Sequence, residues 1–238
     1  MRGFDPIYTD IVDYIVRCTH RIWDERDIGL IHTHYTHNVA VYFNLGPVYI
    51  CEDMVLDTIQ RLVSYPEQRG MATQVIWRGN DLDGFYTTRL VTPSGRHTQT
   101  GHLGKPTGRR FSTRGIGDCM VFENKIYREW VLADNMAILR QLGLDANAIA
   151  EAKARDMLAA GQAGVDIGEN RRPLSQTRPV SEADLSIAHT ETEEWCLRWH
   201  HEVWNKRMLG TIRDVYAPNV QWHGPLMKEL YGPAVVLH

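Results

Sequence analysis

Apolar residues near the N-terminus recur with the period of an α-helix, at Ile11, Ile15 and Ile22. Asp5 followed by Pro6 predicts the N-cap and the first position of this helix, because aspartate accepts from free amides and proline needs no amide donor there. Asp27 predicts the cap of a second, short helix that runs towards Tyr35.

A third helix and a β-rich block follow. Residues 38–43 are typical of a strand, and residues 51–65 return to the helical period through Val55, Ile59, Leu62 and Val63. Strand-like runs separated by turn residues then cover 73–79, 84–92, 96–102, 109–122 and 125–134, and a short helix, 135–143, ends in glycine. Helices first and hairpin-linked strands afterwards predict an α+β fold with an antiparallel sheet.

The chain divides into three parts. Residues 1–145 hold the elements described so far and are expected to form one domain. Residues 146–187 begin with an alanine-rich helix and continue as a polar stretch with glycine and proline, which predicts a flexible linker. A new helical segment begins near Ala188, so residues 188–238 form the third part.

The third part repeats the start of the first, with an offset of 181 residues and no gap. The matched pairs include Arg17 with Arg198, His20 with His201, and Trp23 with Trp204. Nine of the 26 positions from Arg17 to Tyr42 are identical, where chance gives roughly one or two. We therefore expect a complete domain followed by a truncated second copy, since residues 188–238 do not reach the sheet of that copy.

The stretch HTHYTH places three histidines in six positions, at His32, His34 and His37. The repeat aligns none of them with a histidine, and residues two apart on a helix do not share a face. Two converging histidines are too few for a zinc site. We expect polar surface or helix-end histidines here and no metal.

Composition excludes several classes of function. The net charge is −3 and the pI is about 6.4, which gives no electrostatic footprint for nucleic acid or an anionic membrane. The four cysteines are widely separated and fit buried free thiols. The N-terminus has no signal-peptide pattern and no apolar run reaches membrane-spanning length, so a cytoplasmic protein is expected.

Candidate chemistry lies at the end of the last strand. In KIYREWVLAD, alternation places Trp130, Leu132 and Asp134 on one face. If that face lines a cavity, desolvation favours the protonated form of Asp134 and makes it usable as a general acid or base. The alternative is that Asp134 caps the helix that follows. Asp118 and Arg114, on the neighbouring strand, fit a structural ion pair.

Other catalytic systems lack support in the sequence. There is no G-x-S-x-G, no H-E-x-x-H, no cysteine in a nucleophile setting and no dinucleotide fingerprint. The stretch GKPTG is too short for a phosphate loop and predicts a hairpin turn.

Three stretches resemble the SnoaL-like polyketide cyclases of the nuclear-transport-factor-2-like superfamily. They are IWDERDIGLIHTHYTHNV, TGHLGKPTGRRFSTRGIGD and NKIYREWVLADNMAILRQLG. The resemblance implies a cone-shaped α+β domain, in which a curved antiparallel sheet packs against three N-terminal helices around a pocket. It also implies a small hydrophobic organic ligand, no cofactor, and pairing of two copies as a homodimer or within the chain.

For the chemistry, the resemblance implies a ring closure by intramolecular aldol condensation, with Asp134 as acid/base and His102 or Tyr42 assisting. We expect the ligand to be contacted by Trp23, Tyr42, Trp130, Leu132, Arg114 and Asp118. The competing hypothesis is a binding or dimerisation module, because GDCMVF stands where members of the family often carry a histidine. A buried Asp134 facing an open cavity favours the enzyme, and an exposed one bonded to the amides of Met136 or Ala137 favours the binding module.

Overall fold

The computed structural model describes residues 1–44, 46–70, 72–161 and 181–236. The described residues up to 161 form one compact unit, unit 1, and nearly all of those from 181 onwards form a second, unit 2. Most of the predicted linker lies outside the described residues. No described helix is long and apolar enough to cross a membrane.

The first helix, α1, spans Ile11–Trp23 and buries the predicted isoleucines. Its N-cap is Asp10, whose side chain accepts from the amide of Asp13, so the prediction of Asp5 as the cap is wrong. Asp5 instead accepts from the amide of Ile7 in the preceding turn. The buried face begins at Ile11, and the helix starts where burial starts.

The next two helices also differ from the prediction in detail. Helix α2, Leu30–His34, has no side-chain cap, because the carboxylate of Asp27 binds Arg21. Helix α3 spans Cys51–Ser64 and buries Cys51, Met54, Thr58 and Leu62. Ile59 and Val63, which the apolar period assigned to the core, are exposed. The helix is therefore rotated relative to the predicted apolar stripe.

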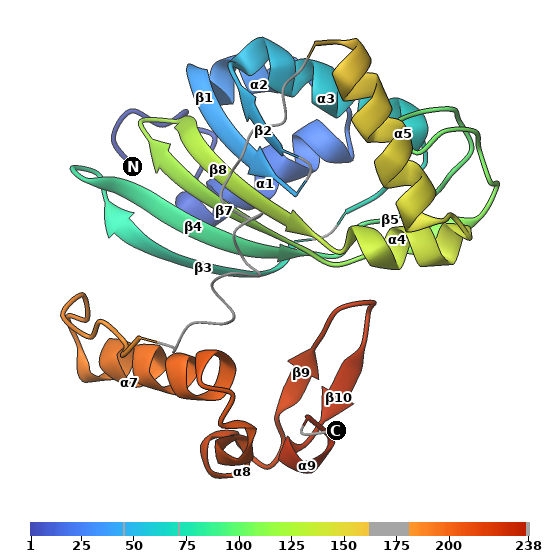
Figure 1. Cartoon of the computed structure of the whole chain (residues 1–238). Coiled ribbons are helices and arrows are strands. Elements are labelled where there is room, and N and C mark those ends of the chain that lie inside the picture. The colour runs from blue at the N-terminus through green and yellow to red at the C-terminus, as the bar shows by residue number, and fades with distance from the viewer. Residues whose placement is uncertain (45, 71, 162–180, 237–238) are drawn as a thin grey trace. The chain divides into compact units, whose positions relative to one another are not determined.

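Unit 1 contains a curved six-stranded sheet in the order β2-β1-β8-β7-β4-β3 (Figure 1). The strands are β1 Tyr35–Phe43, β2 Gly46–Tyr49, β3 Ala72–Asn80, β4 Gly84–Val91, β7 Gly115–Phe122 and β8 Lys125–Ala133. The α+β prediction is confirmed, but the sheet is mixed, since β1 runs parallel to β8. The first strand lies beside the last one, and this pairing of distant segments has no local sequence signal.

Two strands depart from the prediction. The local pattern carries no signal for β2, which pairs with β1. The predicted strand 96–102 is wrong: Ser94–Arg96 forms β5, which pairs with β6, Arg110–Ser112, in a separate two-stranded sheet. Residues 97–102 contain no apolar side chain to bury on a sheet face, and they begin the long connection between β5 and β6.

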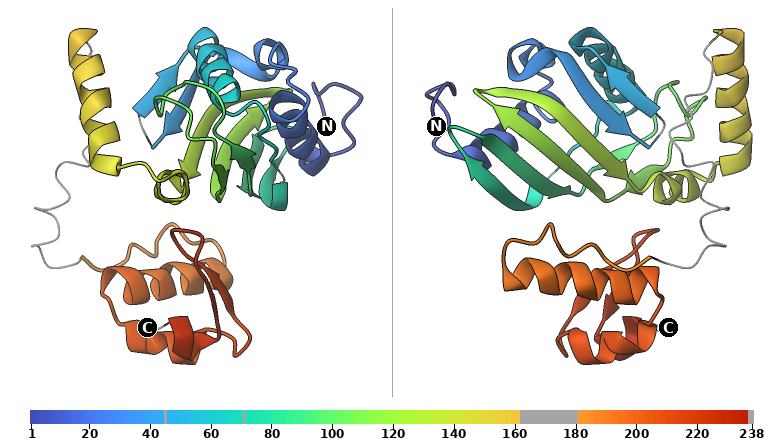
Figure 2. Two further views of the ribbon diagram at one scale, coloured as in Figure 1. Left: turned by 90° about the vertical axis from the view of Figure 1, so that its right-hand side faces the viewer. Right: turned by 60° about the vertical axis from the view of Figure 1, so that its left-hand side comes forward.

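The helices α1, α2 and α3 lie on one side of the six-stranded sheet (Figures 1 and 2). Their buried residues meet those of β1, β4, β7 and β8 in one core cluster, which includes Tyr14, Ile15, Val41, Phe85 and Val121. After β8 come α4, Asn135–Leu142, which ends at the left-handed Gly143, and α5, Ala146–Ala159. The sheet thus has an inner face towards these helices and an outer face towards solvent.

Unit 2 begins with helix α7, Glu191–His200, which carries a capping box formed by Thr190 and Glu193. A π-helical turn, η2, His201–Asn205, continues it. The short η3 Leu209–Thr211 and α8 Ile212–Val215 follow, then the β9–β10 hairpin (Gln221–His223 with Glu229–Tyr231) and α9, Pro233–Val236. The interpretation of this unit as a second copy stays a prediction.

The cap of α1 can be tested by substitution. Asp10→Ala should lower the free energy of unfolding by about 1 kcal/mol, because it leaves an N-terminal amide of a core helix without its acceptor. Asp10→Asn keeps an acceptor and should stay within a few tenths of a kcal/mol of the wild type. Urea denaturation measures both, and equal stability of the alanine variant and the wild type would contradict the assignment.

Candidate functional site

The inner face of the sheet holds a buried polar network at its centre. Arg89, on β4, forms an ion pair with Glu129, on β8, with 2.9 Å between Nη2 and Oε1. The other carboxylate oxygen of Glu129 accepts from the hydroxyl of Tyr35 at 2.9 Å. Arg89 Nη1 donates to the Cys119 sulfur at 2.9 Å. We call Arg89, Glu129, Tyr35 and Cys119 the inner-face network; it joins strands β1, β4, β7 and β8.

Local sequence makes room for this network. Gly117 lies opposite Arg89 in the β4–β7 register, and a Cβ at position 117 would come within 2.8 Å of the guanidinium carbon. The glycine therefore lets the guanidinium lie flat against β7. Arg89, Cys119 and Glu129 alternate with outward-facing residues, as strand geometry requires.

Burial sets the protonation states of these groups. It raises the pKa of the Cys119 thiol well above its ordinary value, so this cysteine is a neutral thiol. Burial also raises the pKa of the Tyr35 hydroxyl, with the charge of Glu129 adding to the effect. For Arg89, burial alone lowers the pKa, but Cys119 and Glu129 outweigh it and raise the pKa. The network holds a charged pair and two neutral groups: the Tyr35 hydroxyl, which donates to Glu129, and the Cys119 sulfur, which accepts from Arg89.

Two polar atoms beside the network have no hydrogen-bond partner among the described residues. They are the hydroxyl of Thr87 and the Nε of Arg89, both on the inner face of β4. The side chains are almost completely buried, with 1% of Thr87 and 6% of Arg89 exposed. An unpaired buried polar atom costs roughly 1–3 kcal/mol, so this pair marks a place where a bound molecule would gain hydrogen bonds.

A second polar cluster lies where α3 ends. The ring of Tyr65 meets those of His97 and His102 edge-on, each at 5.7 Å between centroids. Burial, with Arg61 and Lys153 adding to it, lowers the pKa of His102 to about 4. Burial also lowers the pKa of His97, whose Nε2 has no partner among the described residues, and raises that of Tyr65. Near pH 7 both histidines are neutral.

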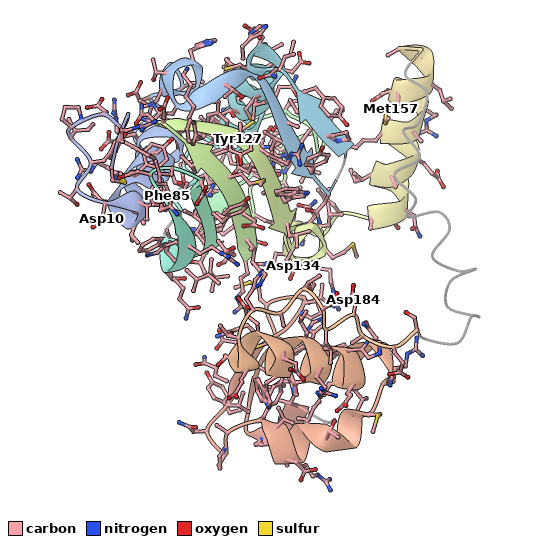
Figure 3. All side chains as sticks on the ribbon, turned by 90° about the vertical axis from the view of Figure 1, so that its left-hand side faces the viewer. Asp10, Phe85, Tyr127, Asp134, Met157 and Asp184 are labelled. Carbon is pink, nitrogen blue, oxygen red and sulfur yellow. The ribbon has the colours of Figure 1, made fainter. Side chains whose placement is uncertain are left out.

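Asp134 lies at the end of β8, where the chain enters α4 (Figure 3). Its Oδ1 accepts from the amide of Ala137 at 3.0 Å, and its own amide donates to the carbonyl of Arg114. This is the capping geometry that the sequence left open as the alternative to a catalytic role. His102, the predicted assistant, belongs to the Tyr65 cluster and its Nδ1 lies 3.5 Å from the hydroxyl of Ser64.

The predicted ligand-contacting residues are divided between the two faces. Trp130 and Leu132 lie on the outer face, 38% and 62% exposed, so they do not line the inside of the domain, and their contact with a ligand stays a prediction. Tyr42 stacks on Trp130 at 5.6 Å, and Asp118 accepts from Thr88 at 2.9 Å, both on this outer face. The sequence correctly placed Trp130 and Leu132 on one face of β8, but the buried face is the opposite one, which carries Glu129.

Trp23 is the predicted contact residue that remains on the helix side. It lies at the C-terminus of α1 and packs, half-buried, against the core cluster. Arg114 lies in the connection between β6 and β7. A backbone hydrogen bond joins Arg114 to Asp134, and no contact described above brings Trp23 or His102 to them.

The three histidines of HTHYTH have separate environments. His34 is buried: its Nε2 lies 2.7 Å from the Tyr8 hydroxyl, and burial lowers its pKa. It is the last residue of α2, so it fits the helix-end alternative and not the surface one. His37 is exposed near Glu52, and His32 approaches the sulfur of Cys51. No group of three or more potential metal ligands occurs among the described residues.

Sequence reasoning missed the inner-face network, although a signal was present. Glu129 shares a strand face with the apolar Val131, and Arg89 shares one with Phe85 and Thr87. Opposite charges on the apolar faces of two separate strands indicate a buried ion pair. The strand order needed to bring the two together was not available from the sequence.

No protein-family profile matches this chain, and no curated protein matches it. Solved structures that resemble it include AclR from Streptomyces galilaeus, provisionally named a hydroxylase, at 18% identity over 64% of this chain and 96% of AclR, with a TM-score of 0.48. A protein from Jannaschia sp. CCS1, provisionally named a SnoaL-like polyketide cyclase, has 13% identity over 58% of this chain and 94% of its own, with a TM-score of 0.48.

A protein from Catenulispora acidiphila with a ketosteroid isomerase-like fold has 13% identity, covers 56% of this chain and 95% of its own, and has a TM-score of 0.47. The structures that resemble this chain are thus SnoaL-like and ketosteroid isomerase-like proteins. Identities this low and TM-scores below one half give no ground for transferring an activity.

The low pKa of His102 predicts a pH dependence of stability. Its pKa is about 4 in the folded protein against an ordinary value of 6.5, so between these values the unfolded chain binds a proton that the folded one does not. The free energy of unfolding should therefore fall as the pH drops from 6.5 to about 4, then level off for this residue. His34 and His97 act in the same direction, since burial lowers their pKa values too.

His102→Asn should reduce this loss of stability, as measured by urea denaturation at pH 6.5, 5.5 and 4.5. His37→Asn is the matched control, because the His37 side chain is 80% exposed. The same pH profile for His102→Asn and the wild type would contradict the prediction.

Proposed function

We propose that residues 1–145 bind a small hydrophobic organic molecule that carries an oxygen acceptor, on the inner face of the sheet. The observation that carries this proposal is the unpaired Thr87 hydroxyl and Arg89 Nε on neighbouring inward positions of β4. Both groups donate hydrogen bonds, so a carbonyl oxygen is a fitting partner for them. The sequence resemblance to SnoaL-like proteins supports the same class of ligand.

The surroundings of this pair support an apolar ligand body. Phe85 lies next to Thr87 on the inward side of β4 and its ring is 6.1 Å from that of Trp77, which is half exposed at the edge strand β3. Val75, opposite Arg89 in the β3–β4 register, is partly buried against the core. Apolar walls with a few placed polar groups are typical of small-molecule sites.

The surroundings of Asp134 favour a binding function over acid–base catalysis by this residue. The carboxylate of Asp134 is half-buried and accepts at its Oδ1 from the amide of Ala137, which is the hydrogen bond we associated with the binding module. A proton-transfer role also requires a carboxylate within hydrogen-bond reach of the substrate. The cyclase hypothesis therefore stays the competing proposal, with Asp134 as its acid/base.

The binding proposal can be tested with 2-acetonaphthone as the probe and 2-ethylnaphthalene as its analogue without an oxygen. The full chain should bind the ketone roughly tenfold more tightly in calorimetric titration, because one to two hydrogen bonds contribute about 1–1.5 kcal/mol. Thr87→Val keeps the shape of the side chain and removes its hydroxyl, and should abolish most of this preference.

Thr88→Val is the matched control, since Thr88 is the next residue on β4 and its hydroxyl faces outward to Asp118. It should bind both probes as the wild type does. Equal affinity of the wild type for the two probes, or an unchanged preference of Thr87→Val for the ketone, would contradict the proposal. Turnover of a ketone substrate that is lost in Asp134→Asn would favour the cyclase hypothesis instead.

A second function is favoured by the outer face of the sheet, which we propose pairs with a second copy of this chain. Large apolar side chains are exposed across four strands: Ile76, Tyr86, Ile116, Phe122, Trp130 and Leu132. Monomeric proteins rarely expose an apolar patch of this extent, and such patches mark interaction sites. Asp118 and Arg128 also lie on this face, and a twofold axis that passes between them would bring opposite charges together.

Charge introduced into the outer face should prevent this pairing. Leu132→Glu and Ile116→Glu should each raise the dimer dissociation constant at least about 100-fold, since a buried unpaired carboxylate costs several kcal/mol. Size-exclusion chromatography with light scattering measures the change. Leu82→Glu, in the β3–β4 turn and 75% exposed, should leave the dimer intact. A wild type that stays monomeric over a roughly 100-fold range of concentration around about 10 μM would contradict the proposal.

A further inference from the structure

Unit 2 contains an open hollow of about 670 Å³ that belongs to neither proposed function. It lies between the extended segment that includes Glu182 and Asp184 and the face of α7 and η2 that carries Cys196, Trp199 and His201. Figure 3 marks Asp184 on this segment, beside α7. The volume is within the range of small-molecule sites.

Two polar atoms of residues that line the hollow have no hydrogen-bond partner among the described residues. They are the indole Nε1 of Trp199 and the Nε2 of His201. His201 is only 8% exposed, so its unpaired nitrogen is not satisfied by bulk solvent. A buried polar atom left without a partner is costly, and it points to a bound group.

A neighbour of His201 determines whether the unpaired Nε2 donates or accepts a hydrogen bond. The side-chain amide nitrogen of Asn205 lies 3.2 Å from Nδ1 of His201. An amide nitrogen only donates, so Nδ1 is the acceptor and the proton of the neutral imidazole is on Nε2. The π-helical turn places these two residues four positions apart on one side of the helix. Residues that line the hollow therefore carry two buried N–H donors, one on Trp199 and one on His201.

The charges of the hollow select among ligands with an oxygen acceptor. Glu182 and Asp184 contribute two carboxylates, the first paired with Lys206 at 2.7 Å and the second accepting from Ser186. A carboxylate has about four acceptor positions, so both retain capacity for a further donor. Negative charge beside the site disfavours an anionic ligand. A ligand that both accepts and donates while remaining neutral fits these groups.

The apolar residues of the hollow define the rest of the ligand. Ile187 and Leu197 contribute aliphatic surface, and Trp199 contributes an aromatic ring that is stacked on Trp195 at 6.0 Å with an interplanar angle of 7°. Flat apolar groups pack well on such a surface. We propose that this hollow binds a neutral aromatic carboxamide, whose carbonyl oxygen accepts from Trp199 or His201 and whose amide group donates to Glu182 or Asp184.

Benzamide tests the proposal on the full chain, with the indole ¹⁵N–¹H signals followed by NMR. The chain has seven tryptophans, and Trp199→Phe assigns the signal of interest by its loss. Benzamide should shift the Trp199 signal in a saturable manner, and benzoate, its anionic analogue, should bind at least about tenfold more weakly. Trp199→Phe removes one donor and keeps an aromatic ring, and should weaken benzamide binding roughly 3- to 10-fold.

Trp204→Phe is the matched control, because Trp204 lies on the same helical segment but does not line the hollow. It should bind benzamide as the wild type does. If Trp199→Phe fails to fold, the imidazole ¹⁵N shifts of wild-type His201 serve instead, and benzamide should shift Nε2 of the Nε2–H tautomer. An unshifted Trp199 signal, equal binding of benzoate, or equal weakening by Trp204→Phe would each overturn the proposal.

Discussion

The ion pair between Arg89 and Glu129 is the constraint on which the sheet of unit 1 depends. It joins β4 to β8 across β7, and its partners Cys119 and Tyr35 extend it to β7 and β1. A buried ion pair is a weak source of net stability, but losing one partner leaves an uncompensated buried charge, which costs about 3–5 kcal/mol. The four strands must therefore keep the register in which these groups meet, and Gly117 is required beneath the guanidinium.

The two faces of this sheet have opposite chemistry, and the two proposed functions follow from that contrast. The inner face combines apolar packing with two unpaired polar groups, which suits a small ligand. The outer face exposes aromatic and aliphatic side chains over most of its strands, which suits a protein surface. Asp134 lies on neither face, because it follows the last residue of β8 and is the N-cap of α4. Its carboxylate is the natural cap at that junction.

The repeat in the sequence places related residues in different surroundings. His20 on α1 is half exposed and binds Asp24, whereas His201, at the matched position of the 181-residue repeat, is buried beside Asn205. Cys18 is buried in unit 1, where its pKa is raised to about 12 by burial, and its matched residue Trp199 lines the hollow of unit 2. Residues matched by the sequence repeat therefore differ in burial and in their partners between the two units.

The sequence by itself determined most of the helices and strands of unit 1, though not β2 or β5, together with the alternation along β8 and the helical face that carries Ile11, Ile15 and Ile22. These follow from local periodicity, which depends only on neighbouring residues. It also left two roles open for Asp134, a helix cap and an acid/base. Only the tertiary structure decided which face of β8 is buried, that β1 runs parallel to β8, and that Arg89 meets Glu129. Periodicity has two equivalent phases on a strand, and the choice between them depends on elements distant in the chain.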